Sequence, residues 1–500
     1  MSNLDDNNLQ ENEDKKLDND NLTKKEDKNK NNPLATESIG KLLVKMIIPA
    51  VIAQIVNLLY NIVDRMFISS IPNIGSLALT GVGVTFPIII LISAFSSLIG
   101  MGGAPKAAIK MGQNDYDGAE KILGNCFTSL IGISVILTVF FLIFSENLLL
   151  IFGASEQTLP YAKEYINIYI MGTIFIQLAL GLNPFINCQG YVNIAMKTIL
   201  IGAGTNIVLD FVFIKIFKIG VKGAAIATVL SQAISAVWVL SFLLKSKLTK
   251  IKIKRKYFKI EKSILLPILA LGISPFIMQS TESLLNIAFN SSLKKYGGDI
   301  AVGSMTIIGT IMQCINLISS GIGQGSQPII SFNYGANNVS RVKKTYNLTI
   351  LITIIFTTIM WVLCLLVPKL FVSLFAKNDI ALMNYANTSL KIYTFCVFIM
   401  GAQFACQQAF VALGQAKVSL FLALLRKIIL LIPLIYILPS VLPDSFINSI
   451  QQSIFSNPIG DKVFAVFLAE PISDFIAATT TITLFIITTK KLFKNKTNVA

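Results

Sequence analysis

Five acidic residues lie well inside long apolar stretches of this 500-residue chain, where they could carry chemistry. They are Asp64, Asp210, Glu282, Glu470 and Asp474. An ionised Asp at the centre of a membrane helix costs ~2.5–3.5 kcal/mol, so such residues are functional candidates by default. A carboxyl group removed from water takes up a proton readily, and carboxylate and amide oxygens suit a hard cation such as Na⁺. The sequence therefore predicts a site for H⁺ or Na⁺.

Two of these acids belong to polar seams along predicted helices. The residues of each seam are three or four positions apart, which at ~100° per residue places them on one narrow helical face. The first seam consists of Gln54, Asn57, Asn61 and Asp64. The second consists of Gln279, Glu282, Asn286 and Asn290. Asn and Gln alone would suit hydrogen bonding between helices. Carboxylates would not, so a functional role is favoured over a structural one for Asp64.

A third predicted helix carries Gly202, Asn206 and Asp210 four residues apart, and hence on one face. Asn206 and Asp210 would supply amide and carboxylate oxygens for Na⁺, or a carboxyl group for a proton. A structural cap or an ion pair is the alternative for Asp210. Arg65 points about 100° away from Asp64 around the helix, so it is not an obvious partner.

These residues would be positioned by membrane-spanning helices. The chain is 54% hydrophobic and 14% charged, whereas soluble domains average about 25% charged residues. A membrane-spanning helix needs ~20 mostly apolar residues. That criterion predicts about twelve spans, at 43–70, 78–103, 124–151, 161–187, 193–217, 223–245, 263–293, 300–331, 346–373, 387–414, 418–440 and 463–488. Runs such as LIGISVILTVFFLIF do not fit the short alternating strands of a β-barrel. The predicted fold class is an all-α integral membrane protein.

The composition excludes several kinds of site. The chain has no histidine, which excludes Ser-His-Asp hydrolases, haem held by a proximal His and most catalytic zinc sites. Its six cysteines are scattered singly, so neither a disulfide framework nor a zinc ribbon is expected. No cofactor is expected, and a membrane-embedded enzyme is disfavoured.

The charged segments predict the topology. Residues 1–38 are polar, of low complexity, and predicted to be a disordered tail. A basic loop spans 247–262, and further Lys residues lie in the tail at 491–500. The positive-inside rule then places both termini in the cytoplasm of a bacterial cell, with the chain in the plasma membrane. The net charge of +16 therefore reports topology, and it does not require nucleic acid as a partner.

The chain also contains an internal repeat. Pro105 and Gly112 match Pro328 and Gly335 at an offset of 223 residues, and Pro49 matches Pro275 at an offset of 226. The repeat divides the chain into an N-lobe at 39–246 and a C-lobe at 263–490, with six spans each. An even number of spans orients both lobes alike, and the interface of such repeats commonly holds a transporter's substrate site. Duplication in a structural protein is the alternative.

At these residues the chain resembles the multidrug and toxic compound extrusion (MATE) family of secondary transporters. The resemblance covers nearly all of 39–490. It depends on the order and spacing of PAVIAQIVNLLYNIVDRMFI, NIVLDFVFI, GAAIAT, GIGQGSQPIISFNYGANN and ALGQAK. It implies two six-helix lobes around a central cavity that faces each side of the membrane in turn. The implied activity is antiport: export of amphipathic, cationic organic compounds in exchange for H⁺ or Na⁺, by a protein expected to be a monomer.

The resemblance also implies roles for single residues. The cation site of the N-lobe would comprise Asp64, Asn206, Asp210 and Thr228, with a looser match at Asn183, and helix bending would occur at Pro49. The substrate cavity would be lined by Gln54, Asn57, Asn61, Gln279, Glu282, Asn286, Gln403 and Gln407. Glu282 would favour positively charged substrates.

The chain departs from one branch of the family, because Gln403, Gln407 and Gln408 stand where an acid is expected. A flippase for lipid-linked precursors is the alternative function. A flippase cavity should be rich in Arg and Lys, whereas the charges inside these spans are mostly acids. Arg426 is the exception, and we expect it toward the cytoplasmic end of its span.

Overall fold

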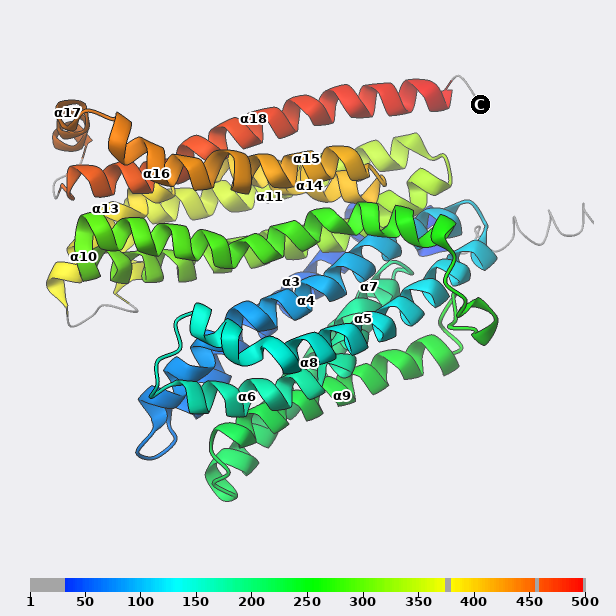
Figure 1. The fold of residues 1–500 in the computed structure, drawn as a ribbon. Coiled ribbons are helices and arrows are strands. Elements are labelled where there is room, and N and C mark those ends of the chain that lie inside the picture. Colours follow the sequence, from blue (N-terminus) through cyan, green and yellow to red (C-terminus); the bar gives the residue numbers. More distant parts are fainter. Residues whose placement is uncertain (1–31, 374–378, 455–457, 498–500) are drawn as a thin grey trace, which may run out of the picture.

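The computed structural model describes residues 32–373, 379–454 and 458–497, and within these ranges the regular elements are all helical (Figure 1). Apolar side chains cover long stretches of helix surface, such as Val135, Ile136 and Val139, which are more than half exposed. Such an apolar surface is unfavourable in water but is compatible with the hydrocarbon of a bilayer. The architecture therefore confirms the prediction of an all-α membrane protein.

The first half of the chain forms one group of helices. Its elements are α3 (Ile39–Ser69), α4 (Gly75–Gly112), α5 (Tyr116–Ile151), α6 (Leu159–Met171), α7 (Thr173–Asn187), α8 (Val192–Asp210), the π-helical turn η1 (Phe211–Ile216) and α9 (Val221–Lys245). Helices α6 and α7 meet at an angle of 59° and together make one bent span. Each of the predicted spans in this half has a helical counterpart, extended at some ends by several residues.

The second half forms the other group. Its elements are α10 (Lys262–Gly335), α11 (Val339–Leu366), α12 (Pro368–Val372), α13 (Ile380–Tyr393), α14 (Val397–Ala412), α15 (Ala416–Leu424), the π-helical turn η3 (Leu425–Leu431), α16 (Ile432–Val441), α17 (Asp444–Ile454) and α18 (Asp461–Thr497). Helices α13 and α14 again form a bent pair, at 53°. Helix α15, η3 and α16 follow one another directly along a single span.

Helix α10 contains two spans joined by a sharp reversal. Gly298 adopts φ +64°, ψ −155°, a conformation outside the helical region that glycine adopts without steric cost. Ile268 before this point and Phe332 after it both lie against α4, beside Gly102 and Gly112. The two halves of α10 therefore run back along each other. With this reversal and the two bent pairs, the described residues make the twelve predicted passes.

The repeat is visible in the lengths and bends of the elements. Helix α4 begins at Gly75 and ends at Gly112, and the second half of α10 follows Gly298 and ends at Gly335, 223 residues later in both cases. The bends of the two broken spans fall at Gly172 and just before Val397. The C-lobe has an insertion before its last span, and this insertion contains α17. The two lobes therefore share the same order of helices, and the C-lobe differs by the insertion that contains α17.

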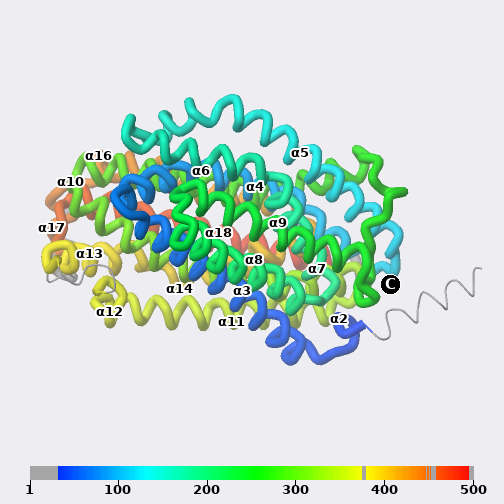
Figure 2. The backbone as a smooth tube through the Cα atoms, turned by 90° about the horizontal axis from the view of Figure 1, so that it is seen from below, coloured from blue at the N-terminus to red at the C-terminus, as the bar shows by residue number. Residues whose placement is uncertain are grey.

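The two lobes join at one end of the molecule, which we call the terminal end because it holds α2 (Pro33–Thr36) and the C-terminal end of α18 (Figures 1 and 2). Toward the opposite, far end the lobes diverge. Glycines make the junction close: a Cβ on Gly112 would lie 2.0 Å from the carbonyl O of Phe332, and one on Gly335 would lie 2.0 Å from that of Ile109. Such residues allow helix backbones in membranes to pack directly on each other.

Residues 32–38 differ from the prediction of a disordered tail, because they form α2 and pack at the junction. Leu34 is buried. Its carbonyl O accepts hydrogen bonds from Nδ2 of Asn333 at 2.9 Å and from Nη2 of Arg341 at 3.0 Å. Sequence composition could not reveal this, since the anchoring groups come from α10 and α11. The remainder of the predicted tail, residues 1–31, lies outside the described residues.

The basic loop at 247–262 packs against the N-lobe. Ile251 and Ile253 are buried. Nζ of Lys254 lies 2.5 Å from Oε2 of Glu120, which is a buried acid near the start of α5. At the other end of the chain, α18 continues through Thr497, into the segment 491–500 that was expected to be a tail.

Gly112→Leu tests the glycine junction. The leucine side chain would collide with the backbone of α10, so we expect the terminal end to open. The reporter is Gln324→Cys in a Cys314→Ser background. A maleimide should react with this cysteine several-fold faster when Gly112→Leu is present than when Gly112 is unchanged. Gly132→Leu is the matched control, because no atom lies within 4 Å of a Cβ there. Equal reaction rates for the two leucine variants would contradict a closed glycine junction.

Candidate functional site

The structure brings together Asp64 of α3, Asn206 and Asp210 of α8 and Thr228 of α9, all of them buried. Asn206 and Asp210 lie one turn apart at the end of α8, and the π-helical turn η1 follows directly after Asp210. Such π-helical interruptions of an α-helix are frequent at functional sites. With the Asn206 amide in the orientation that satisfies its hydrogen bonds, Nδ2 donates to Oδ2 of Asp210 at 2.8 Å. Its Oδ1 accepts from the backbone N–H of Thr228 at 3.3 Å. Sequence spacing alone could not establish this meeting of three helices.

The carboxyl groups of Asp64 and Asp210 are close enough to interact directly with each other. We call these two residues the N-lobe carboxyl pair. Each has an Oδ1 that is buried and has no hydrogen-bond partner among the described residues. A buried polar atom without a partner is costly, and two carboxylates in contact repel. The arrangement is thus suited to a shared proton or to a small cation held between oxygens.

Tyrosines surround the carboxyl pair, and the sequence analysis did not identify them. Tyr165 Oη lies 3.4 Å from Oγ1 of Thr228, and Tyr165 stacks on Tyr169, with 6.2 Å between ring centroids. Tyr60 precedes Asp64 by one helical turn and is close to it. The spacing of Tyr60 from Asp64, and of Tyr165 from Tyr169, was a signal in the sequence. These aromatic rings keep the carboxyl pair out of water.

Asn183 is placed elsewhere in the N-lobe. Its Nδ2 donates to the carbonyl O of Ala195 at 3.3 Å. Ala195 precedes Asn206 by eleven residues, which corresponds to about 16 Å along α8. The structure therefore does not bring Asn183 to the carboxyl pair. Arg65 also turns away, and its guanidinium lies 4.4 Å from the centroid of the Phe86 ring.

Two of the predicted cavity residues lie where the lobes touch. Nε2 of Gln54 donates to Oε1 of Gln324 at 3.1 Å, and Nε2 of Gln279 donates to Oγ of Ser97 at 2.8 Å. Both bonds cross from one lobe to the other. Phe95 and Phe276 meet nearby, with 5.0 Å between their ring centroids. These residues close the space between the lobes on the side of the terminal end.

The other residues of the two seams are more open. Asn57 and Asn286 are exposed, and Nδ2 of Asn61 donates to the carbonyl O of Asn57 at 2.7 Å. Helix α3 continues through Pro49 as one helix from Ile39 to Ser69. Pro49 lies on the terminal side of Gln54, within the part of α3 that contacts the C-lobe.

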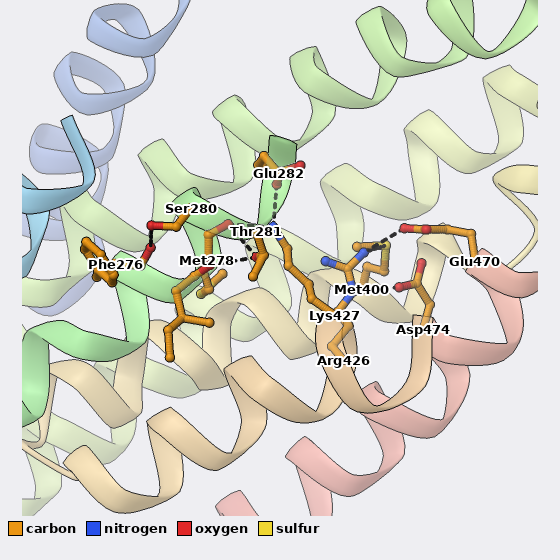
Figure 3. Close-up of polar contacts among 11 residues, drawn as sticks. Phe276, Met278, Ser280, Thr281, Glu282, Met400, Arg426, Lys427, Glu470 and Asp474 are labelled. Atoms are coloured by element: carbon orange, nitrogen blue, oxygen red, sulfur yellow. Dashed lines mark hydrogen bonds and ion pairs between the residues drawn. The ribbon is translucent and has the colours of Figure 1, made fainter. Parts of the chain in front are cut away.

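The C-lobe contains a group of five paired charges, which we call the C-lobe ion-pair cluster (Figure 3). Nε of Arg426 lies 2.8 Å from Oδ1 of Asp474, and its Nη2 lies 3.0 Å from Oε1 of Glu470. Nζ of Lys427 lies 2.5 Å from Oε1 of Glu282 and 2.6 Å from the carbonyl O of Met278. All three acids inside the predicted C-lobe spans therefore have a cation beside them.

The sequence analysis identified Arg426 but neither its acidic partners nor Lys427 beside it. Arg426 and Lys427 open the π-helical turn η3 in the interior of their span, and both are buried. The charges inside spans were expected to be mostly acids, and the three acids of the C-lobe prove to be paired with these two cations. The sequence signal was the RK dipeptide within an apolar run, together with acids four residues apart at Glu470 and Asp474.

The predicted glutamines of α14 lie inside the C-lobe. Nε2 of Gln407 donates to Oγ of Ser274 at 2.9 Å and to Oγ of Ser419 at 3.0 Å. Gln403 lines a pocket of about 20 Å³ together with Arg426 and Lys427, which is room for about one water molecule. Gln407 thus joins α10, α14 and α15, and Gln403 borders the ion-pair cluster.

Comparisons with known proteins agree with this fold. The MatE family model matches residues 49–212 and 275–437, more than half of the chain. Multidrug export protein MepA of Staphylococcus haemolyticus (strain JCSC1435) is 27% identical over 405 residues, covering 81% of this chain and 88% of that protein. MepA of Staphylococcus aureus (strain MRSA252) is 25% identical over 392 residues, covering 78% and 85%.

Solved structures show the same architecture. An outward-facing multidrug resistance MATE family transporter of the MOP superfamily superposes with a TM-score of 0.82 at 23% identity, covering 93% of this chain and 98% of that one. A MATE structure in the bent conformation gives the same TM-score and identity, covering 92% and 97%.

Arg426→Met tests the ion-pair cluster. The change leaves Glu470 and Asp474 buried without a cation, which should destabilise the protein by about 3–5 kcal/mol. A lower midpoint of thermal unfolding in detergent would report this loss. The triple change Arg426→Met, Glu470→Gln and Asp474→Asn removes the charges together and should recover most of it. Lys294→Met breaks the exposed pair with Asp299 and should change little. An unfolding midpoint unchanged by Arg426→Met would refute the pairing.

Proposed function

Because this chain belongs to the MatE family, that of the multidrug and toxic compound extrusion transporters, we propose that it exports amphipathic organic cations in exchange for H⁺ or Na⁺. The observation that carries this proposal is the N-lobe carboxyl pair, with its unpartnered oxygens. H⁺ or Na⁺ would bind between Asp64 and Asp210, with Asn206 and Thr228 as further oxygen ligands. The multidrug export proteins among its relatives support the choice of substrate.

Helix α3 would couple the cation site to the movement of the lobes. It carries Asp64 in the N-lobe and, ten residues or about 15 Å earlier, Gln54 at the contact with α10. A cation that draws Asp64 toward Asp210 would therefore move the same helix that holds the terminal end closed. Pro49 leaves a carbonyl of α3 without its helical hydrogen bond and would make a bend there less costly. Thermodynamic linkage makes this coupling reciprocal: if the bound cation weakens substrate binding by some factor, the bound substrate weakens cation binding by the same factor.

The charge distribution supports an orientation with both termini in the cytoplasm. The basic loop at 247–262 and the lysines near the end of α18 all lie at the terminal end. Positive residues gather in cytoplasmic loops of membrane proteins. The conformation described here would then be open to the outside, with its cytoplasmic end closed by the glycine junction.

Glu282 would face the substrate, because Gln279, three residues earlier, contacts Ser97 of the other lobe. Residues three apart in a helix lie near the same face. The Glu282 side chain is 52% exposed, whereas its partner Lys427 is 5% exposed. An organic cation would thus compete with Lys427 for this carboxylate. Arg426 and Lys427 are both engaged by acids, which favours a cation exporter over a flippase that must bind phosphates.

Dye efflux from liposomes tests the cation site. Purified protein should transport a cationic dye when given a pH gradient or a Na⁺ gradient, and comparing the two identifies the ion. Asp64→Asn and Asp210→Asn should each reduce efflux to that of protein-free liposomes, because the pair can no longer bind the ion. Asp299→Asn changes an acid whose side chain is 90% exposed, and it should transport normally. Sustained efflux by either pair variant would exclude the proposed site.

Lys427→Met tests the competition at Glu282. Removing the ammonium group should lower the dissociation constant for tetraphenylphosphonium by about twentyfold, since a charge ~10 Å away contributes on the order of 1.7 kcal/mol at an effective dielectric constant of ~20. Glu282→Gln should raise that constant, and the double variant should bind like the unmodified protein. A neutral substrate is the control. If the dissociation constant changes in the same direction in both single variants, or changes as much for the neutral substrate, then an organic cation does not compete with Lys427 for Glu282.

A further inference from the structure

A second cavity lies outside the transport path, between α11, α14 and α18 at the terminal end. It has a volume of about 720 Å³, and one part of its lining is basic whereas the rest is mainly apolar. Lys343, Lys490 and Lys494 line one part. The apolar part is formed mainly by Ile350, Ile354, Ala402, Cys406, Ile482 and Ile486. We propose that this cavity binds an anionic phospholipid of the surrounding bilayer, with the phosphate at the lysines and an acyl chain along the apolar wall.

The two parts follow from helix periodicity. In α11, Lys343, Asn347, Ile350 and Ile354 are three or four residues apart and share one face. In α18 the order along the chain is reversed: Ile482 and Ile486 come first, and Lys490 and Lys494 follow. Because the helices are antiparallel here, all three lysines gather at the terminal end and the isoleucines point toward the membrane centre. The cavity is therefore amphipathic along its length.

Its length fits one leaflet. Lys343 and Ile354 are eleven residues apart, which corresponds to about 16 Å of helix. Half of the ~30 Å hydrocarbon core of a bilayer is about 15 Å. A lipid with its headgroup at Lys343 would thus place its acyl chain beside Ile350 and Ile354 and end near the bilayer centre. Small side chains on α14, Ala402 and Cys406, leave the space that the chain would fill.

The charge of the lining favours an anion. Among the described residues that line the cavity there is no Asp or Glu. Lys343 lies over the Phe493 ring, with 5.4 Å from Nζ to the centroid, which keeps its ammonium group at the cavity wall. Tyr346 contacts Phe485 and Phe493, at 5.0 and 6.5 Å between ring centroids, and so joins α11 to α18 beside the lysines. Basic pockets between membrane helices recognise anionic headgroups by this chemistry.

Native mass spectrometry of the purified, full-length protein tests the site. With acyl chains held the same, the protein should retain phosphatidylglycerol in preference to phosphatidylcholine. Lys343→Gln, Lys490→Gln and Lys494→Gln should each weaken phosphatidylglycerol binding by about fivefold, or roughly 1 kcal/mol. Ile350→Trp fills the apolar part and should also reduce binding, although every lysine remains.

The control is the triple change Lys245→Gln, Lys247→Gln and Lys259→Gln, which removes three charges, more than any single test variant, from exposed positions at the same end. It should retain phosphatidylglycerol. The midpoint of thermal unfolding in phosphatidylcholine checks that every variant is folded. Equal retention of both lipids, equal loss in the control triple, or displacement of phosphatidylglycerol by inorganic phosphate alone would each overturn the proposal. The readout is binding, so its outcome is independent of transport.

Discussion

A carboxylate inside a membrane must be neutralised, and this chain meets that requirement in two different ways. In the N-lobe, Asp64 interacts with Asp210, and neither carboxyl group forms an ion pair with a Lys or Arg among the described residues. In the C-lobe, Glu282, Glu470 and Asp474 each form an ion pair with Arg426 or Lys427. A charge satisfied by a fixed cation has little need of a mobile one. The N-lobe pair is left as the place where an ion from solution would complete the structure.

The internal repeat makes this asymmetry informative. Asp64 corresponds to Asn290 at the offset of 226 residues, and Arg426 corresponds to Gly202 at the offset of 224. Helix lengths, bends and the glycine junction recur in both lobes, whereas the buried charges do not. The repeat thus specifies a shared framework for two lobes that can rock against each other. Different side chains then give one lobe the carboxyl pair that we propose as the ion site, and the other lobe a cluster of ion pairs.

Much of this architecture could be predicted from the sequence. Long apolar runs predicted the twelve passes, and helical spacing placed Asn206 and Asp210 on one face. Its polar seam had already singled out Asp64 as a candidate, and the resemblance to a known family then added Thr228 to the group. What the sequence could not predict depends on which helices become neighbours. Arg426 finds its acids 44 and 48 residues later, on α18. Asn183 lies on a predicted span beside α8 but about four turns from Asp210, a distance that no pattern within one helix reveals.

The short helix α2 links the two lobes at the end where they close. Leu34 packs among N-lobe residues such as Met46. Its carbonyl O and that of Glu37 accept three hydrogen bonds from Asn333 and Arg341 of the C-lobe. Any state that separates the lobes here must first break these bonds, at a cost on the order of 3 kcal/mol. Added to an activation barrier, that amount slows a step by about a hundredfold. If transport requires the lobes to separate at this end, the segment before the first span would act as a latch that limits the rate of the cycle.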